Sequence, residues 1–182
     1  MLLVLGGSQG ARPLNRALWQ AAPMLAAAAR RSGRPFELVH LAGDADAAPL
    51  AARYRACGLR AFVSPWLADM NAAYRAADLA LCRAGGSTIA ELLACALPAV
   101  LVPLPHAAGD HQRANALAAA RRGAAWALEE RELQRPAVLR AIVALLADPE
   151  RLEPMRRAAA AAACIEAADR IAACILEETE CR

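Results

Sequence analysis

Apolar and polar residues follow one another in blocks along the first two thirds of the chain. Short apolar runs, each followed at once or nearly so by glycine, proline or a charged residue, predict buried strands over residues 2–5, 36–41 (where Glu37 and His40 interrupt the run), 61–63, 79–82, 99–102 and 124–128. Longer segments between them predict helices over residues 12–30, 45–57, 69–77, 89–97 and 110–122. Strands that alternate with helices in this way predict an α/β fold, a doubly wound parallel sheet of about six strands.

The last third of the chain has a different pattern. From about Glu129 no strand is predicted, and helices are expected over residues 133–146, 152–164 and 166–178. A length of 182 residues suits one domain with a sizeable core. We therefore expect a Rossmann-like core over residues 1–128 and a helical C-terminal extension over residues 129–182 that packs on the same domain.

Composition narrows the function classes. Only 4% of the residues are aromatic, so we expect an aliphatic, alanine-rich core. The net charge is +3 and the arginines are scattered, which argues against a nucleic-acid partner. The six cysteines lack zinc-ligand spacing, so we expect no metal site from them and a reducing, cytoplasmic setting. The sequence suggests neither a signal peptide nor a membrane-spanning run.

The stretch from Arg83 to Glu91 carries the strongest sign of a binding site. It lies between a predicted strand and a predicted helix, and its two adjacent glycines are followed by Ser87 and Thr88. Such a turn can direct several free backbone N–H groups at one point, with the positive end of the helix dipole behind them. Because phosphate is the usual anion at such a site, we interpret the stretch as a turn that holds the diphosphate of a sugar nucleotide.

Other loops are expected at the same edge of the sheet. The turns at Gly6, Gly43 and Gly85 and the loops at Pro65 and Pro103 all follow predicted strands. In open parallel sheets, ligands bind beyond the carboxyl ends of the strands. These five segments should therefore converge on one site.

Two of the motifs have a second interpretation. Residues 6–10 match the G-x-S-x-G elbow of serine hydrolases, with Ser8 as nucleophile, although that elbow normally lies deeper in the chain. Residues 88–91 match a capping box, in which Glu91 would bond the N–H of Thr88 instead of a ligand.

Other polar and aromatic residues also leave alternatives open. Asp110 is either a helix N-cap or, with His106 and His111, part of a metal site whose spacing matches no known pattern. Trp66 can stack on a base, but a tryptophan beside an apolar residue is more often in the core. Trp19 and Trp126 are predicted core residues.

Three segments together resemble one family. They are Leu-Gly-Gly-Ser-Gln-Gly-Ala-Arg at residues 5–12, Cys-Arg-Ala-Gly-Gly-Ser-Thr-Ile-Ala-Glu at residues 82–91, and residues 105–116 with Asp-His-Gln at 110–112 and Asn-Ala at 115–116. In order and spacing they resemble the carboxyl-terminal half of the bacterial MurG glycosyltransferases of glycosyltransferase family 28. The resemblance is close over residues 2–129 and looser beyond. It implies one Rossmann-like half of a GT-B glycosyltransferase.

The resemblance implies an activity. These enzymes transfer N-acetylglucosamine, with inversion, from UDP-N-acetylglucosamine to lipid-linked N-acetylmuramoyl-pentapeptide, the step from lipid I to lipid II in peptidoglycan synthesis. They use no metal or other cofactor. The resemblance also implies a peripheral position on the cytoplasmic face of the cell membrane.

The resemblance implies the residues of a UDP-sugar site, and no catalytic residue within this chain. His111 is the least typical of them, since the family often has glutamine at that position. The implied contacts are Ser8 and Gln9 near the diphosphate, the Leu67 backbone at uracil, Gly86, Ser87 and Thr88 on the diphosphate, Glu91 on the ribose hydroxyls, and His111, Gln112 and Asn115 facing the sugar.

The sequence departs from the family in length, because family members carry a second, amino-terminal domain with the acceptor site. We therefore expect weak UDP-sugar binding and no turnover from this chain alone. Two alternatives remain: a nucleotide-sugar-binding subunit of a split glycosyltransferase, and a serine hydrolase that uses Ser8.

Overall fold

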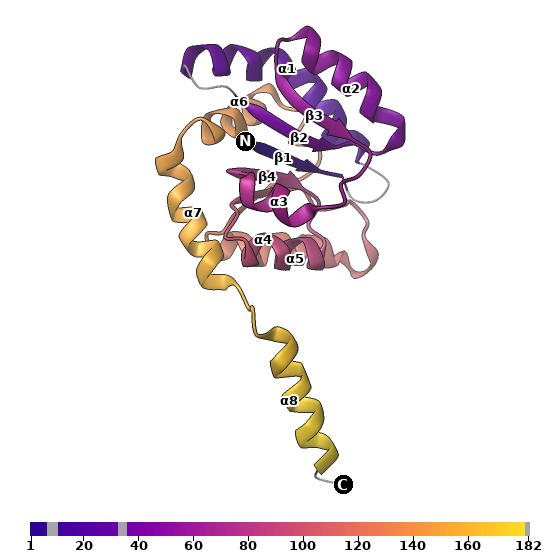
Figure 1. The fold of residues 1–182 in the computed structure, drawn as a ribbon, viewed down its shortest axis with the longest axis vertical. Coiled ribbons are helices and arrows are strands. Elements are labelled where there is room, and N and C mark those ends of the chain that lie inside the picture. Colours follow the sequence, from indigo (N-terminus) through magenta and orange to yellow (C-terminus); the bar gives the residue numbers. More distant parts are fainter. Residues whose placement is uncertain (7–10, 33–35, 181–182) are drawn as a thin grey trace.

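A six-stranded parallel sheet forms the centre of the protein, in a computed structural model that describes residues 1–6, 11–32 and 36–180 (Figure 1). The strand order is β3-β2-β1-β4-β5-β6, which confirms the predicted doubly wound α/β fold. The strands are β1 (Leu2–Leu5), β2 (Glu37–Leu41), β3 (Arg60–Ser64), β4 (Leu79–Cys82), β5 (Ala99–Leu101) and β6 (Ala125–Ala127). The helices are α1 (Arg12–Ser32), α2 (Asp44–Ala56), α3 (Met70–Ala76), α4 (Gly86–Ala94), α5 (His111–Arg121), α6 (Pro136–Leu146), α7 (Pro149–Ala162) and α8 (Ala167–Glu180), with a 3-10 turn η1 (Ala108–Asp110) before α5.

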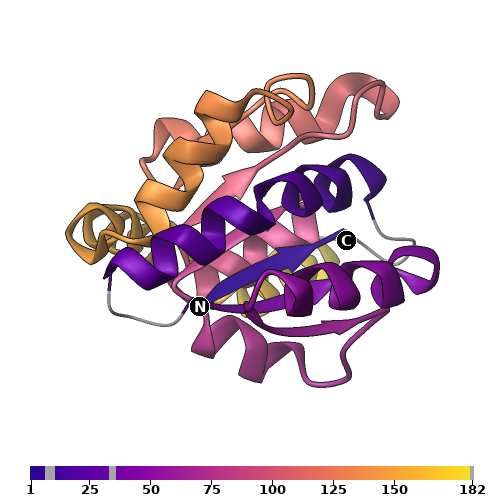
Figure 2. The same ribbon diagram turned by 90° about the horizontal axis from the view of Figure 1, so that it is seen from above.

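Both faces of the sheet are covered by helices. α1, α2 and α6 lie over one face and α3, α4 and α5 over the other (Figure 1). Seen from above, α1 crosses the sheet between α2 and α6 (Figure 2). α7 packs on both α6 and α4 and so connects the two layers beside the sheet. This double covering explains why the central strands are continuous apolar runs rather than alternating ones.

The strands β1 and β4 show this two-sided burial most clearly. Leu2 and Val4 belong to the core under α1, whereas Leu3 and Leu5 belong to the core under α3 and α4. β1 pairs with β4 so that Leu5 lies opposite Cys82 at the carboxyl ends of both strands. Helices leave this pair of strands toward opposite faces, which makes it the topological switch point where ligands bind in such sheets.

A buried polar network fixes the start of α1 against β2 and α2. The Nδ2 of Asn15 donates to the carbonyl oxygen of Ala42 at 2.9 Å and to Asp46 Oδ2 at 2.7 Å. These two acceptors orient the amide, so Asn15 Oδ1 accepts from Nε2 of His40 at 3.0 Å. His40 Nδ1 then accepts from the Tyr54 hydroxyl at 2.8 Å. Burial lowers the pKa of His40 to about 4, so the ring is neutral at pH 7.

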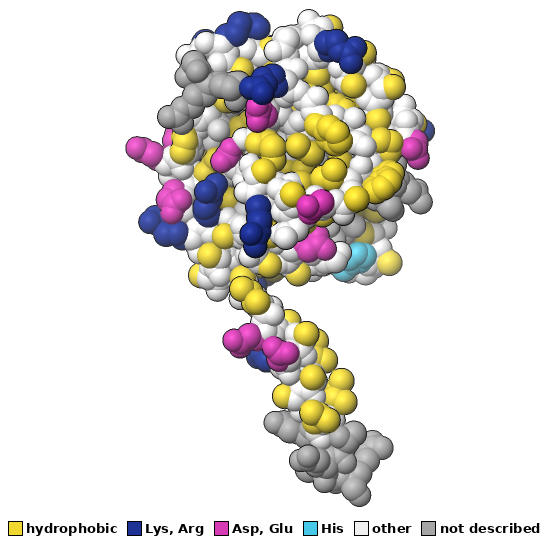
Figure 3. Space-filling view, viewed as in Figure 1, with side chains coloured by type: hydrophobic (Ala, Val, Ile, Leu, Met, Phe, Trp, Pro, Cys, Tyr) yellow, Lys and Arg dark blue, Asp and Glu magenta, His cyan; other side chains and the backbone are white. Residues whose placement is uncertain are grey.

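The C-terminal region contains only helices. α6 packs on α1, and α7 packs on α4, but α8 extends away from the rest of the molecule (Figure 1). The space-filling view shows hydrophobic side chains along α8, among which Ile171 is 62% exposed (Figure 3). We expected all of residues 129–182 to pack on the domain, and α8 departs from that arrangement; the boundary at residue 128 stays a prediction. No helix in the described part of the chain is long and apolar enough to cross a membrane.

Candidate functional site

A cavity of about 890 Å³ lies at the carboxyl ends of β1 and β4. Its position is the switch point of the sheet, and its size suits a small-molecule ligand. The expected convergence of loops is confirmed for Gly6, Pro65 and Gly85 and for the loop that begins at Pro103, while Gly43 does not line the cavity. The lining residues are Leu5, Gly6, Ala11, Arg12, Pro13, Leu41, Pro65, Trp66, Leu67, Met70, Tyr74, Cys82, Arg83, Gly85, Thr88, Leu104, Pro105, Gln112 and Glu130.

The N-terminus of α4 forms one side of the cavity. The first hydrogen bond of the helix runs from the N–H of Ile89 to the carbonyl oxygen of Gly85 at 3.0 Å. The N–H groups of Gly86, Ser87 and Thr88 precede this bond and have no acceptor within the helix. Their partial positive charge, added to the helix dipole, favours an anion at this point.

The capping box, one of two interpretations of residues 88–91, is not formed. We expected the helix over residues 89–97, but α4 starts at Gly86 and its N-cap Gly85 makes no side-chain capping bond. Glu91 is therefore in the middle of the helix. Its Oε2 accepts a 2.6 Å hydrogen bond from the hydroxyl of Tyr74, a buried residue of α3 that lines the cavity. Burial, and then the bond to Glu91, raise the pKa of Tyr74, so the phenol remains a donor.

The loop after β3 and the first turn of α3 form an apolar side of the cavity. Leu67 and Met70 line it, and Trp66 lies at the cavity with 69% of its surface exposed. The carbonyl oxygen of Trp66 accepts a 2.8 Å bond from the Ser64 hydroxyl, which anchors the loop. A core position for Trp66 is therefore wrong, and its large exposed ring is available to a ligand.

The other two tryptophans differ from each other. Trp19 is 41% exposed and lies under the guanidinium of Arg53, 5.5 Å from the ring centre, so its predicted core position is also wrong. Trp126 is half-buried and packs on the hydrophobic core, in agreement with the prediction.

The loop between β5 and α5 forms a third side of the cavity. Gln112 lines the cavity, and its Oε1 accepts a 3.0 Å bond from the N–H of Leu104. Asn115 donates from Nδ2 to the carbonyl oxygen of Ala84 at 3.2 Å, which attaches α5 to the turn before α4. His111 is exposed, and its Nδ1 lies 2.6 Å from the Ala108 carbonyl oxygen. Neither Asn115 nor His111 lines the cavity.

The backbone of this loop has an unusual conformation. His106 and Asp110 have φ angles of 59° and 52°, in the left-handed region that is sparsely used outside glycine. Asp110 holds the N-cap position of α5 but makes no side-chain capping bond. Among the described residues, no group of three or more His, Cys, Asp or Glu side chains is placed to hold a metal ion.

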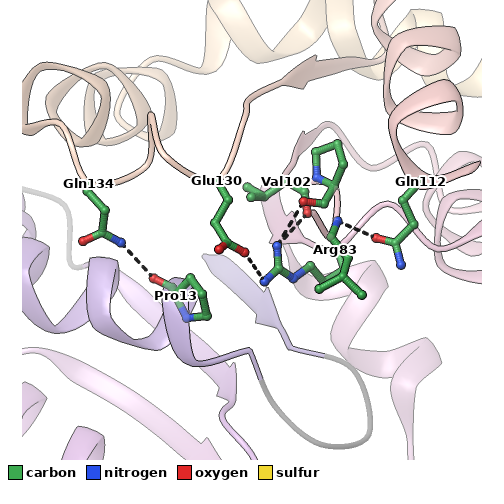
Figure 4. Close-up of polar contacts among 8 residues, drawn as sticks. Pro13, Arg83, Val102, Gln112, Glu130 and Gln134 are labelled. Carbon is green, nitrogen blue, oxygen red and sulfur yellow. Dashed lines mark hydrogen bonds and ion pairs between the residues drawn. The ribbon is translucent and has the colours of Figure 1, made fainter. Parts of the chain in front are cut away.

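Arg83 fixes the floor of the cavity (Figure 4). Its Nη1 donates to the carbonyl oxygens of Val102 at 3.3 Å and Pro103 at 3.2 Å, and its Nη2 lies 2.5 Å from Glu130 Oε2. The side chains of Arg83 and Glu130 are only 13% and 26% exposed. One guanidinium thus joins the ends of β4 and β5 to the loop after β6. Nearby, Gln134 donates to the Pro13 carbonyl oxygen at 3.4 Å.

The predicted site residues are distributed around this cavity. Leu67, Thr88 and Gln112 line it, and Gly86 and Ser87 directly precede Thr88 in the first turn of α4. Glu91 does not line the cavity itself but accepts a hydrogen bond from Tyr74, which does. Ser8 and Gln9 lie outside the described residues.

A family model supports the interpretation of the fold and the motifs. The model described as the glycosyltransferase family 28 C-terminal domain matches residues 1–171. The chain belongs to this glycosyltransferase family. The match covers the whole sheet, all sides of the cavity and most of the C-terminal helices.

Individual family 28 relatives agree. The chain is 46% identical over 162 residues to a protein from Pseudomonas fluorescens strain Pf-5, named UDP-N-acetylglucosamine–N-acetylmuramyl-(pentapeptide) pyrophosphoryl-undecaprenol N-acetylglucosamine transferase, and covers 43% of it with 87% of its own length. A protein of the same name from Anaeromyxobacter sp. strain Fw109-5 is 43% identical over 94% of this chain and 44% of the relative. The crystal structure of Acinetobacter baumannii MurG superposes with a TM-score of 0.83 at 32% identity, over 97% of this chain and 49% of that one. The chain therefore spans about half the length of these relatives.

Sequence reasoning missed several lining residues. Tyr74 and Met70 lie one helical turn apart on α3, a spacing that indicates a common face, yet nothing in the sequence distinguishes a face on the core from a face on a cavity. Arg83 belonged to a quoted motif but had no assigned role. Its partner Glu130 is 47 positions away, and no local pattern indicates that contact.

Proposed function

We propose that this chain is the donor-binding half of an inverting glycosyltransferase and that its cavity binds UDP-N-acetylglucosamine. The acceptor would be the lipid-linked N-acetylmuramoyl-pentapeptide whose parts occur in the relatives' name. The observation that carries the proposal is the meeting of the α4 N-terminus with an exposed tryptophan in one cavity. A nucleoside diphosphate offers the matching pair, a diphosphate for the helix and a flat base for the ring.

The proposed contacts follow from the donors and acceptors around the cavity. The free N–H groups at the start of α4, with the hydroxyls of Ser87 and Thr88, suit the diphosphate. The Leu67 backbone and the Trp66 ring suit uracil. The Oε1 of Glu91, which has no partner among the described residues, suits the ribose hydroxyls as an acceptor.

The sugar would lie toward α5. The Gln112 amide has used its oxygen on Leu104, so its NH₂ group remains a donor. Asn115 has used its Nδ2 on Ala84, so its Oδ1 remains an acceptor. These two groups, with His111, are the proposed sugar contacts, and Ser8 and Gln9 are assigned to the diphosphate.

The proposed chemistry is electrostatic. When the bond from the sugar to UDP breaks, negative charge grows on the diphosphate, and the fixed N–H groups of α4 stabilise it without a metal ion or other cofactor. The acceptor hydroxyl must lose a proton. We assign the base that takes this proton, and the site that holds the acceptor's reacting sugar, to the half of the relatives that this chain does not match. A lipid-linked acceptor also leads us to propose a peripheral position on the cytoplasmic membrane face.

Calorimetry with UDP and UDP-N-acetylglucosamine tests the proposal. A glycine pair supplies matched variants. At Gly85, which lines the cavity at φ −65°, an added Cβ would lie 3.7 Å from Thr88 Oγ1, so Gly85→Ala should fold normally and still obstruct the ligand. At Gly86 only the backbone N–H is assigned to the ligand, and alanine keeps that donor. Gly86 does not line the cavity and its added Cβ would lie 3.9 Å from Asn115 Nδ2, so Gly86→Ala should retain binding. Failure of the unaltered chain to bind either nucleotide at millimolar concentration would overturn the proposal.

A further inference from the structure

A second groove of about 780 Å³ lies beside the main cavity. The first turns of α1 form one side, and the loops after β5 and β6 form the other. The two hollows share Arg12, Pro13, Pro105 and Glu130, so they are neighbours. Glu130 lines both hollows and is paired with Arg83, and Gln134 of the groove donates a hydrogen bond to the carbonyl oxygen of Pro13 (Figure 4).

The groove is positively charged. Four arginines line it (Arg12, Arg16, Arg113 and Arg131), against the two acidic residues Glu129 and Glu130. Both glutamates are already paired. Glu129 lies 3.1 Å from Arg113 Nε, and Glu130 is held by Arg83, whose guanidinium lines the main cavity rather than the groove.

Three of the four groove arginines form no salt bridge with the described residues. Arg12, Arg16 and Arg131 are exposed, and within the described residues none of them takes part in a salt bridge. Arg12 and Arg16 lie one helical turn apart, on the same side of α1. Guanidinium groups on two facing sides of a groove are the arrangement that binds phosphate oxygens by paired N–H donors.

We propose that this groove binds a phosphate or diphosphate group of a second ligand, separate from the nucleotide sugar. The inference goes beyond the proposed function, because it depends only on the lining of the groove. A carboxylate ligand would fill fewer of the donors, since a diphosphate offers more oxygens to three guanidinium groups. The diphosphate of a lipid-linked acceptor and the headgroup of an anionic lipid share this chemistry.

Calorimetry with inorganic pyrophosphate in saturating UDP tests the groove while the main cavity is occupied. The informative variant is Arg16→Ala with Arg131→Ala, which leaves Arg12 in place because Arg12 also lines the main cavity. Its control is Arg55→Ala with Arg140→Ala, an equal change of charge at exposed helix positions outside the groove. We expect about a tenfold loss of pyrophosphate affinity in the groove variant, no loss in the control, and unchanged UDP affinity in both.

Two outcomes would overturn the proposal. One is pyrophosphate binding that UDP abolishes, which would place the anion at α4. The other is an equal loss of affinity in the groove variant and in its control. Sedimentation with vesicles of phosphatidylglycerol, against phosphatidylcholine, then identifies the source of the phosphate. Groove-dependent vesicle binding indicates a lipid headgroup, and pyrophosphate binding without vesicle binding indicates a diphosphate-bearing acceptor.

Discussion

The hydroxyl of Tyr74 donates a 2.6 Å hydrogen bond to one carboxylate oxygen of Glu91 and so couples α3 to α4 at the edge of the cavity. Glu91 itself is exposed, and the bond fixes its rotamer while leaving the second oxygen as an acceptor. In the proposed complex this acceptor meets the ribose. The coupling makes Glu91 the residue on which the ribose assignment depends.

Substitution of Glu91 tests that assignment. Glu91→Ala should lower UDP affinity about tenfold, because a charge-assisted hydrogen bond to the ribose is lost. Asn115→Ala should change UDP affinity much less, since Asn115 is assigned to the sugar. Titration calorimetry with UDP measures both, and nearly equal losses would contradict the ribose assignment. Tyr74→Phe, which keeps the carboxylate but frees its rotamer, should give an intermediate loss.

The two exposed tryptophans form a matched pair. Trp66→Ala should weaken UDP binding by about 1–3 kcal/mol through lost base stacking and leave stability nearly unchanged, because the side chain is 69% exposed. Trp19→Ala should instead lower stability slightly, through its packing and its contact with Arg53, and leave UDP affinity unchanged. Calorimetry and urea denaturation separate the two effects. Full UDP affinity in the Trp66→Ala variant would show that the Trp66 ring does not contact the base.

The arginine partners of two neighbouring glutamates, Glu130 and Glu129, supply a second pair of matched variants. Arg83→Met should destabilise the chain by about 3 kcal/mol. It removes the donor to two carbonyl oxygens and leaves the largely buried carboxylate of Glu130 without its partner. Arg113→Met breaks the ion pair with Glu129. The Arg113 and Glu129 side chains are 55% and 44% exposed, so the loss of stability should be about 0.5 kcal/mol or less. Urea denaturation measures both free energies of unfolding. Similar values for the two variants would show that Arg83 does not fix the cavity floor.

The buried network at His40 predicts a pH dependence of stability. The pKa of His40 is lowered from 6.5 to about 4 by burial, against a smaller opposing effect of Asp46. Between these values the unfolded chain binds a proton that the folded chain does not, so stability is full above pH 6.5 and falls as the pH drops toward 4. The loss should reach about 3 kcal/mol.

The variant His40→Gln removes this titration. It should be less stable than the unaltered chain at pH 7, yet lose less stability between pH 7 and 4.5. Urea denaturation across this range measures the difference. Parallel pH profiles for the two proteins would assign the acid sensitivity to other groups.

The sequence was most informative where one local pattern decides the structure. β1 and β4 have the predicted bounds because unbroken apolar runs ended by Gly6 and Arg83 leave little choice of register. Gly58 follows the end of α2 at φ +72°, a left-handed conformation that glycine adopts without strain after a helix. The described parts of the family motifs lie around one cavity because each motif follows a strand of one parallel sheet.

The sequence was less informative where tertiary contacts compete with a local pattern. The Thr88–Glu91 spacing fits a capping box, but Tyr74 offers Glu91 a partner from another helix, and the glycines before Ser87 accept helical geometry. The exposure of Trp66 depends on the path of a loop around Pro65. The pairing of Arg83 with Glu130 depends on the return of the chain after β6.

The central position of β1 has a consequence for synthesis of the protein. β1 pairs on one side with β2, the next strand in the chain, and on the other side with β4. Leu5 therefore lies opposite Cys82, although most of the first eighty residues separate them in sequence. A nascent chain that has released only β1, β2 and β3 from the ribosome holds one edge of β1 unpaired. The cavity lies at the carboxyl end of that unpaired edge. Translation must therefore pass β4 before a nucleotide, bound as we propose, can stabilise the folded chain.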